Sequence, residues 1–314
     1  MTPPSKSDGK QRQRPSVRAT IQAAVAGIRG GVYFNAPLRD YTSFRIGGPA
    51  DVLVEPADIH DVVRLVIQAR TQELPVFVVG GTNLLIRDKG IRGIVVSLAN
   101  LRAITEEPGS VLYAEGGVGM PTLISYAIRR SLAGLEWAAG IPGTVAGCVV
   151  MNAGTRLGEM KDSLKAVRMV TRAGAVIERS AREMKFSYRR TTLPPGIVVG
   201  VWVQLTPGIG PEIAKVVKDY LHYRRATQPL TLPSAGCVFK NPPNESAGRV
   251  VELAGLKGAR VGDAQVSDKH GNFIVNQGDA TAKDVLTLIR KVRAQVAIRT
   301  GVKLELELKL VGQG

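Results

Sequence analysis

The feature that most constrains the fold is a glycine turn that joins two apolar runs with no helix between them. Residues 76–79 form a short apolar run, the turn Gly-Gly-Thr-Asn occupies residues 80–83, and a second run covers residues 94–98. In a dinucleotide-binding fold of the Rossmann type, a helix begins directly after such glycines. The order strand, loop, strand argues against that fold. The turn could still form a cradle of backbone amides that binds a phosphate.

A second glycine series runs from residue 140 to residue 154 as Gly-Ile-Pro-Gly-Thr-Val-Ala-Gly-Cys-Val-Val-Met-Asn-Ala-Gly. Glycine lets a backbone approach a ligand closely, so this series suits a pyrophosphate that lies along the loop. A tight turn packed beneath a helix would need the same residues. Two such loops in one domain favour the ligand.

Residues 234–241, Ser-Ala-Gly-Cys-Val-Phe-Lys-Asn, place Cys237 on a turn of small residues. A free thiol has a pKa of about 8.5, which makes it a candidate proton donor whose activity declines at alkaline pH. The alternative is a small buried apolar side chain, which describes most free cysteines.

Composition excludes several classes of protein. With 314 residues the chain has room for two or three domains. It has no apolar run long enough to span a membrane, so no membrane insertion is expected. Two cysteines are too few for a disulfide framework and indicate a reducing cytoplasm. The three histidines, His60, His222 and His270, are not spaced as metal ligands, so no metal is expected.

The net charge of +16 indicates an anionic partner. Basic residues are scattered along the chain, and aromatic residues make up only 5% of it. A nucleic-acid-binding protein would show clustered bases and stacking aromatics. A polyanionic small molecule is therefore the favoured partner, and no nucleic acid is expected.

Periodicity predicts a chain in three parts. Residues 1–20 are expected to be a disordered basic tail, residues 21–208 a strand-rich domain, and residues 209–314 an α+β domain. Helices are predicted after Asp58, after Pro211 and after the capping box of Thr281 with Asp284. The apolar face of the first is predicted to hold Ile59, Val62, Val63, Val66 and Ile67, and that of the second Ile213, Val216, Val217, Tyr220 and Leu221.

The last strand is predicted from strict alternation. Leu304, Leu306, Leu308 and Leu310 are expected to face the core. Glu307 is expected on the opposite, polar face.

These segments together resemble the family of UDP-N-acetylenolpyruvoylglucosamine reductases (MurB), in its compact second type. The resemblance covers about residues 33–311, and it rests on six segments in order: residues 41–48 (Tyr-Thr-Ser-Phe-Arg-Ile-Gly-Gly), 80–83, 140–154, 186–189 (Phe-Ser-Tyr-Arg), 234–242 and 304–308. It implies an α+β fold, with an FAD-binding domain of the vanillyl-alcohol-oxidase/PCMH type followed by a C-terminal α+β substrate domain.

The resemblance also implies the reaction. NADPH reduces non-covalently bound FAD, and the flavin then reduces UDP-N-acetyl-3-O-(1-carboxyvinyl)glucosamine to UDP-N-acetylmuramate. The enzyme would act as a cytoplasmic monomer in peptidoglycan synthesis and cell-wall biogenesis, and so in cell shape, cell division and the cell cycle. Another PCMH-type flavin oxidoreductase, acting on a sugar or an alcohol, is the alternative. Such enzymes often tether FAD through histidine, and neither glycine loop contains one.

Three residues match the catalytic positions of the family. Cys237 stands where the family most often has serine and would donate a proton. Arg189 would hold the substrate carboxylate, or it could be a surface ion-pair partner. Glu307 would lie near the same carboxylate, or it could be a solvated residue on its strand.

The remaining assignments are binding residues. The cofactor would be held by Arg45, Gly80, Gly81, Thr82, Asn83, Leu84, Gly140, Ile141, Gly143, Thr144, Gly147 and Asn152. Arg45 and Asn152 could instead serve only the structure of their loops. The substrate would be held by Tyr188, Arg225, Gln228, Asn241 and His270.

Overall fold

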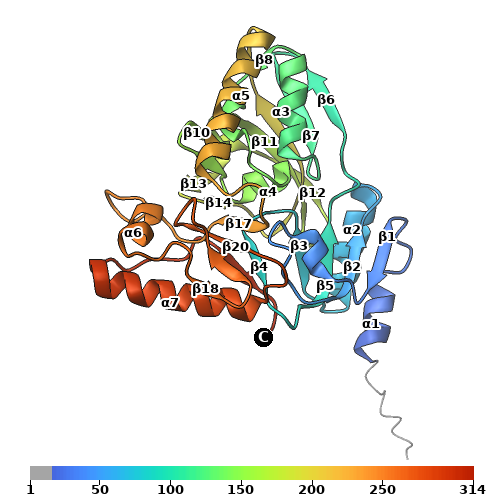
Figure 1. Ribbon diagram of the computed structural model, residues 1–314. Helices are drawn as coiled ribbons and strands as arrows, with labels where there is room; N and C mark the ends of the chain where they lie inside the picture. Colours follow the sequence, from blue (N-terminus) through green and yellow to red (C-terminus); the bar gives the residue numbers. More distant parts are fainter. Residues whose placement is uncertain (1–15) are drawn as a thin grey trace, which may run out of the picture.

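The computed structural model describes residues 16–314, which form three groups of elements coloured blue, green to yellow, and orange to red in Figure 1. Most of the expected tail, residues 1–20, lies outside that range. The last residues of the expected tail differ from the expectation, because helix α1 (Val17–Ala24) begins within residues 1–20, with Ser16 as its N-cap. Ile21 and Ala24 are buried, and this apolar face holds the helix against the protein.

The first group is a four-stranded sheet in the order β1-β2-β5-β3, in which β1 is antiparallel to β2 and the other pairs are parallel. Its strands are β1 (Gly31–Phe34), β2 (Ala50–Glu55), β5 (Ile91–Ser97) and β3 (Val76–Val79). The chain passes from β3 through the first glycine loop into β4 (Leu84–Ile86) and then β5. No helix intervenes between β3 and β5, as the sequence predicts.

Helix α2 (Ile59–Thr71) follows β2 and is capped by Asp58, as predicted; the Asp58 side chain accepts hydrogen bonds from two backbone amides of the first turn. Val62 and Val66 are buried, but Ile67 is 46% exposed. The prediction for Ile67 was wrong because the buried face follows residues 62, 65, 66 and 69, and Ile67 lies off that face.

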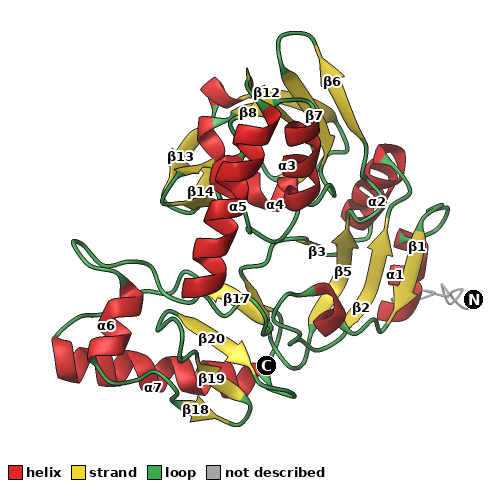
Figure 2. Cartoon of the chain, turned by 45° about the horizontal axis from the view of Figure 1, so that its top comes forward, coloured by secondary structure: helices red, strands yellow, loops and turns green. Residues whose placement is uncertain are grey.

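The second group is an antiparallel five-stranded sheet in the order β12-β11-β15-β7-β6. In Figure 2 three helices lie together against this group. The strands are β12 (Val176–Ser180), β11 (Leu164–Thr171), β15 (Gly196–Gln204), β7 (Val111–Glu115) and β6 (Ile104–Glu107). The helices are α3 (Met120–Arg129), α4 (Val145–Val150) and α5 (Gly210–Thr227).

Three short strand pairs complete this group. They are β8 (Leu132–Ala133) with β16 (Thr206–Pro207), β9 (Gly154–Thr155) with β10 (Gly158–Glu159), and β13 (Lys185–Ser187) with β14 (Arg190–Thr192).

The third group is a four-stranded antiparallel sheet in the order β17-β20-β19-β18, packed with two helices. Its elements are β17 (Ser234–Cys237), β20 (Phe273–Asn276), β19 (Ala264–Val266), β18 (Arg260–Val261), α6 (Ala247–Leu253) and α7 (Ala282–Thr300). The predicted capping box of Thr281 with Asp284 is present, and Gly301 ends α7 in a left-handed conformation.

Helix α5 belongs with the second group rather than with the C-terminal part. Its Val217 and Tyr220 lie in the larger hydrophobic core, and the helix packs against α3. The second core then begins at Ala235 in this half of the chain. The predicted domain boundary at residue 208 therefore lies one helix before the point where the chain leaves the first hydrophobic core. The turn residues before α5 predict a boundary there, but the buried side chains of α5 pack into the first core. Val216, expected on the buried face, is 48% exposed.

The C-terminal segment crosses back to the first glycine loop. Leu304 and Leu308 are buried as predicted, but only β21 (Lys309–Val311) is a regular strand, and it pairs in parallel with β4. The Asn83 side chain donates a hydrogen bond to the Glu307 carbonyl oxygen at 2.9 Å. This return brings Glu307 to the loop that follows β3. Within residues 16–314, no helix is both long enough and apolar enough to cross a bilayer.

Candidate active site

A cleft of about 850 Å³ lies where the three groups of elements meet. One wall consists of the two glycine loops, another of the C-terminal end of α5, and a third of residues from the C-terminal group. This volume is within the usual range of ligand sites. The cleft contains most of the residues that the sequence assigned to chemistry or binding.

The two glycine loops contact each other directly. Thr144 N donates a hydrogen bond to Gly80 O at 3.0 Å, and the Thr144 side chain accepts one from Gly147 N at 3.2 Å. A Cβ atom at Gly147 would lie 3.0 Å from Gly80 O. Gly80 and Gly143 have φ angles of +147° and +103°, which favour glycine. The loops therefore leave little room for side chains where they meet.

Gly81 is open where its neighbours are crowded. A Cβ there would meet no atom of the described residues within 4 Å, and Gly81 lines the cleft together with Thr82 and Ile141. Exposed backbone without side-chain bulk is what a pyrophosphate requires for close approach. These loops thus fit the pyrophosphate of a dinucleotide cofactor.

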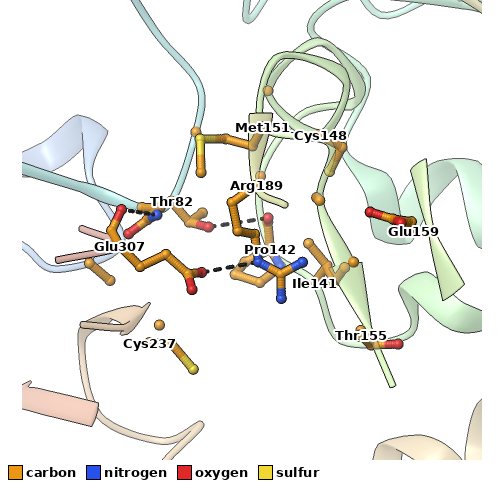
Figure 3. Close-up of a pocket in the computed structure, with 18 of the residues that line it drawn as sticks. Thr82, Ile141, Pro142, Cys148, Met151, Thr155, Glu159, Arg189, Cys237 and Glu307 are labelled. Carbon is orange, nitrogen blue, oxygen red and sulfur yellow. Dashed lines mark hydrogen bonds and ion pairs between the residues drawn. The ribbon is translucent and has the colours of Figure 1, made fainter. Parts of the chain in front are cut away.

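Glu307 is the centre of the polar contacts in the cleft (Figure 3). One carboxylate oxygen accepts a hydrogen bond from Arg189 Nε at 3.1 Å, which Figure 3 marks. The other accepts one from the Tyr188 hydroxyl at 3.1 Å. Only 9% of the Glu307 side chain is exposed. Glu307 therefore lies in the cleft, and the alternative of a solvated residue is excluded.

Arg189 lies in the turn between β13 and β14. Its φ angle is +56°, a conformation uncommon for residues other than glycine, and its side chain is 25% exposed. The guanidinium carbon lies 4.9 Å from the centre of the Tyr188 ring. Tyr188 has a pKa raised to about 12, first by burial and then by the charge of Glu307. The turn thus presents a cation and a protonated phenol to one carboxylate.

Cys237 enters the cleft through a break in β17. Gly236 has a φ of +74°, and the register of β17 against β20 shifts between Ser234 and Cys237. The thiol is half-buried, and in Figure 3 it lies on the same side of the cleft as Glu307. Burial and then the charge of Glu307 raise the pKa of Cys237 to about 12, against the opposing effect of nearby guanidiniums. The expectation of a thiol with a pKa near 8.5 was wrong for this environment.

Five of the predicted binding residues do not line the cleft. Arg45 is exposed on a turn with a φ of +54°, and Leu84 is buried in β4. Asn152 is fully buried and holds its loop through hydrogen bonds to Glu159 and to backbone atoms. The other two are Gly140 and Arg225.

The remaining predicted residues line the cleft: Gly80, Gly81, Thr82, Asn83, Ile141, Gly143, Thr144, Gly147, Tyr188, Arg189, Gln228, Cys237, Asn241, His270 and Glu307. Two of these also have structural hydrogen bonds. Asn241 accepts one from Ala247 N, and His270 Nδ1 accepts one from Asn272 N. Burial lowers the pKa of His270.

Arg224 is the main site residue that the sequence analysis missed. It lines the cleft and is only 9% exposed, whereas the side chain of Arg225 is exposed. The buried face of α5 runs through residues 213, 217, 220 and 224, so continuing the helical period by one more turn would have selected Arg224. Gly140, with a φ of +76°, packs against its guanidinium.

Arg156 and Tyr223 are further cleft residues without a sequence signal. The guanidinium carbon of Arg156 lies 3.9 Å from the centre of the Tyr223 ring. Arg156 lies in the turn between β9 and β10, and Tyr223 lies on α5. Only the packing of this hairpin against the helix brings the two together.

Comparison with known proteins gives two family matches. Residues 50–180 match the FAD binding domain, and residues 228–311 match the C-terminal domain of UDP-N-acetylenolpyruvoylglucosamine reductase. The second match begins directly after α5. Together, the cleft and these two domains define a flavin-dependent oxidoreductase.

Individual relatives agree over almost the whole chain. UDP-N-acetylenolpyruvoylglucosamine reductase 2 of Symbiobacterium thermophilum is 48% identical over 88% of this chain and 91% of its own length. The reductase of Moorella thermoacetica is 44% identical over 92% of this chain and 96% of its own length. The crystal structure of MurB from Thermus caldophilus matches with a TM-score of 0.77 at 40% identity, covering 90% of this chain and 98% of the other. The chain belongs to the UDP-N-acetylenolpyruvoylglucosamine reductase family.

Proposed function

We propose that the protein reduces UDP-N-acetyl-3-O-(1-carboxyvinyl)glucosamine to UDP-N-acetylmuramate, with NADPH as the reductant, as a step of peptidoglycan synthesis. The observation that carries this proposal is the position of Glu307, bonded to Arg189 and Tyr188 in the same cleft as Cys237. Reduction of an enolpyruvyl double bond needs a hydride at one carbon and a proton at the other. It also needs a cation for the carboxylate.

Bound FAD would supply the hydride to the vinyl carbon. Arg189 would hold the substrate carboxylate and offset the negative charge that develops beside it, which suits the fixed fork of a guanidinium. Cys237 would donate its proton to the carbon next to that carboxylate. Glu307 would orient Arg189 and Tyr188 through the two hydrogen bonds described above.

The cofactor residues proposed to face FAD are those of the two loops that line the cleft: Gly80, Gly81, Thr82, Asn83, Ile141, Gly143, Thr144 and Gly147. Asn152 and Gly140 would act by supporting the second loop. For the substrate we propose Tyr188, Gln228, Asn241 and His270, all of which line the cleft. We further propose that the enzyme works as a monomer in the cytoplasm.

The decisive experiment separates the two half-reactions. The FAD-loaded enzyme is photoreduced without oxygen, the enolpyruvyl substrate is added, and reoxidation of the flavin is followed by its absorbance. Rapid reoxidation with formation of UDP-N-acetylmuramate is expected. A flavin that stays reduced would overturn the proposed reaction, and an enzyme acting on a free sugar or alcohol would behave in that way.

The role of Cys237 is tested in the same assay. Cys237→Ala is expected to keep normal flavin reduction by NADPH and to slow reoxidation by substrate by about 10²-fold or more, the usual contribution of a general acid. Cys237→Ser should restore much of the rate. Equal losses in both half-reactions would count against proton donation.

A further inference from the structure

Arg224 is a buried cation whose partners are all neutral. Its Nη1 donates a hydrogen bond to Ala139 O at 3.0 Å, and its Nε and Nη2 donate to Gln228 Oε1 at 3.0 and 2.8 Å. Among residues 16–314, no carboxylate lies within ion-pair distance of it. Burial lowers its pKa. A buried charge is costly unless something compensates it, and since its three hydrogen bonds all go to neutral acceptors, a negative charge in the cleft would stabilise this side chain further.

The charges around Cys237 indicate where that negative charge appears. Cys237, Glu307, Arg189 and Arg224 all line the same cleft, where the charge of Glu307 raises the pKa of the thiol and the charges of Arg189 and Arg224 lower it. The phenol of Tyr188 lines the same cleft and is neutral at ordinary pH, since its pKa is about 12. Arg189 is already paired with Glu307. Arg224 is therefore the one guanidinium of this set with no carboxylate of its own.

We propose that Arg224 offsets the negative charge left on the sulfur of Cys237 when the thiol gives up its proton. In this step the S–H bond breaks, a C–H bond forms on the substrate carbon next to the carboxylate, and the S–H electron pair stays on sulfur. The thiolate then takes a proton from solvent before the next turnover. Arg224 is a positioning residue that acts through Cys237, and the inference rests on the proposed role of Cys237 as proton donor.

The first test measures thiolate formation directly. The oxidised, FAD-loaded enzyme without substrate is treated with iodoacetamide from pH 8 to pH 10, and peptide mass analysis separates labelling of Cys237 from that of Cys148. Arg224→Gln keeps hydrogen-bond donors but removes the charge. It should slow alkylation of Cys237 about three- to tenfold, which corresponds to a pKa increase of about half to one unit.

Two variants control for structural effects. Arg224→Lys keeps the charge and should stay within about twofold of the parent in alkylation rate. Lys218→Gln removes a positive charge from the exposed face of the same helix and should have no effect. Unchanged alkylation in Arg224→Gln would overturn the proposal, as would equal losses in Arg224→Gln and Arg224→Lys.

The second test is a double-mutant cycle on the substrate half-reaction. Arg224→Gln should slow proton transfer about tenfold when Cys237 is present and add no further loss to Cys237→Ala, since residues that act together are not additive. Equal losses in the parent and in Cys237→Ala would show that Arg224 acts on a group other than Cys237. That result would overturn the proposed role of Arg224 but leave Cys237 as the proton donor. A normal rate in Cys237→Ala would instead overturn the proton donor itself and this inference with it.

Discussion

At the scale of single residues, the environment of Cys237 matters more than its chemical type. A free thiol ionises near pH 8.5, but burial and the charge of Glu307 raise the pKa of Cys237 to about 12. The thiol therefore stays protonated throughout the ordinary working range. In this respect it resembles a serine hydroxyl more than a reactive cysteine.

This environment changes the expected pH dependence. A proton donor must be protonated, so the rate of flavin reoxidation by substrate should stay level from pH 7 to pH 10 and fall only as pH approaches about 12. Cys237→Ser should give the same level profile over that range. Stopped-flow measurements on pre-reduced enzyme check this. A midpoint near pH 8.5 in the cysteine enzyme alone would contradict it.

The resemblance to the family selects the proposed catalytic set but not its contacts. Its members, Arg189, Cys237 and Glu307, are assigned by the motifs in which they stand. The hydrogen bond between Arg189 and Glu307 joins residues 118 positions apart in the chain, so no local pattern could reveal it. The helical period of α5 places Arg224 on its buried face, whereas the resemblance assigned the neighbouring Arg225 to the site.

At the scale of elements, adding a side chain would have different effects in the two glycine loops. Gly147 lies in α4 with its Cβ position 3.0 Å from the backbone oxygen of Gly80, whereas Gly81 faces open space in the cleft. One position holds the loops together, and the other keeps room for a ligand. The sequence predicts both loops but does not separate these roles, which depend on the contact between the loops.

Alanine substitutions should therefore separate stability from cofactor binding. Gly81→Ala is expected to leave the melting temperature of the cofactor-free protein unchanged and to weaken FAD binding about tenfold, because the added methyl enters the cleft. Gly147→Ala should lower both the melting temperature and FAD affinity, since crowding of a backbone atom costs about 1–3 kcal/mol. Thermal unfolding without FAD and fluorescence titration with FAD measure the two effects. Similar melting temperatures for both variants would contradict the assignment.

At the scale of the whole molecule, segments far apart in the chain hold the C-terminal group against the first group. Strand β21 pairs with β4. The carboxylate of Asp88, just after β4, accepts hydrogen bonds from Ala282 N and Lys283 N at 2.8 and 3.0 Å. It thus adds a negative charge at the N-terminus of α7, where the helix dipole favours one.

Removing this contact should weaken the protein measurably. Asp88→Ala is expected to lower the free energy of unfolding by about 1 kcal/mol, typical of a lost helix cap. The midpoint of urea unfolding gives the measurement. Lys89→Ala, which alters the exposed neighbour and leaves Asp88 intact, should keep the parent midpoint. If Asp88→Ala has that same midpoint, the contact contributes nothing to stability.

Local sequence patterns therefore predict individual helices, strands and loops, whereas the grouping of these elements depends on how they pack together. The order of β3, glycine loop and β5, the cap of α2 and the capping box of α7 all depend on residues close in sequence. The assignment of α5 to the second group depends on contacts with α3 and on burial of Val217 and Tyr220. The hydrogen bond from Asn83 to Glu307 spans 224 positions, which no periodicity can encode.

The return of the C-terminal segment to β4 also has a consequence for synthesis on the ribosome. Glu307 is translated after every other residue of the proposed catalytic set. A chain cut short just before it would carry both glycine loops and the cysteine turn, yet it would lack the carboxylate that accepts hydrogen bonds from both Arg189 and Tyr188. Truncated chains would also lack β21 and its pairing with β4, so on the proposed mechanism only molecules translated through this segment would turn over.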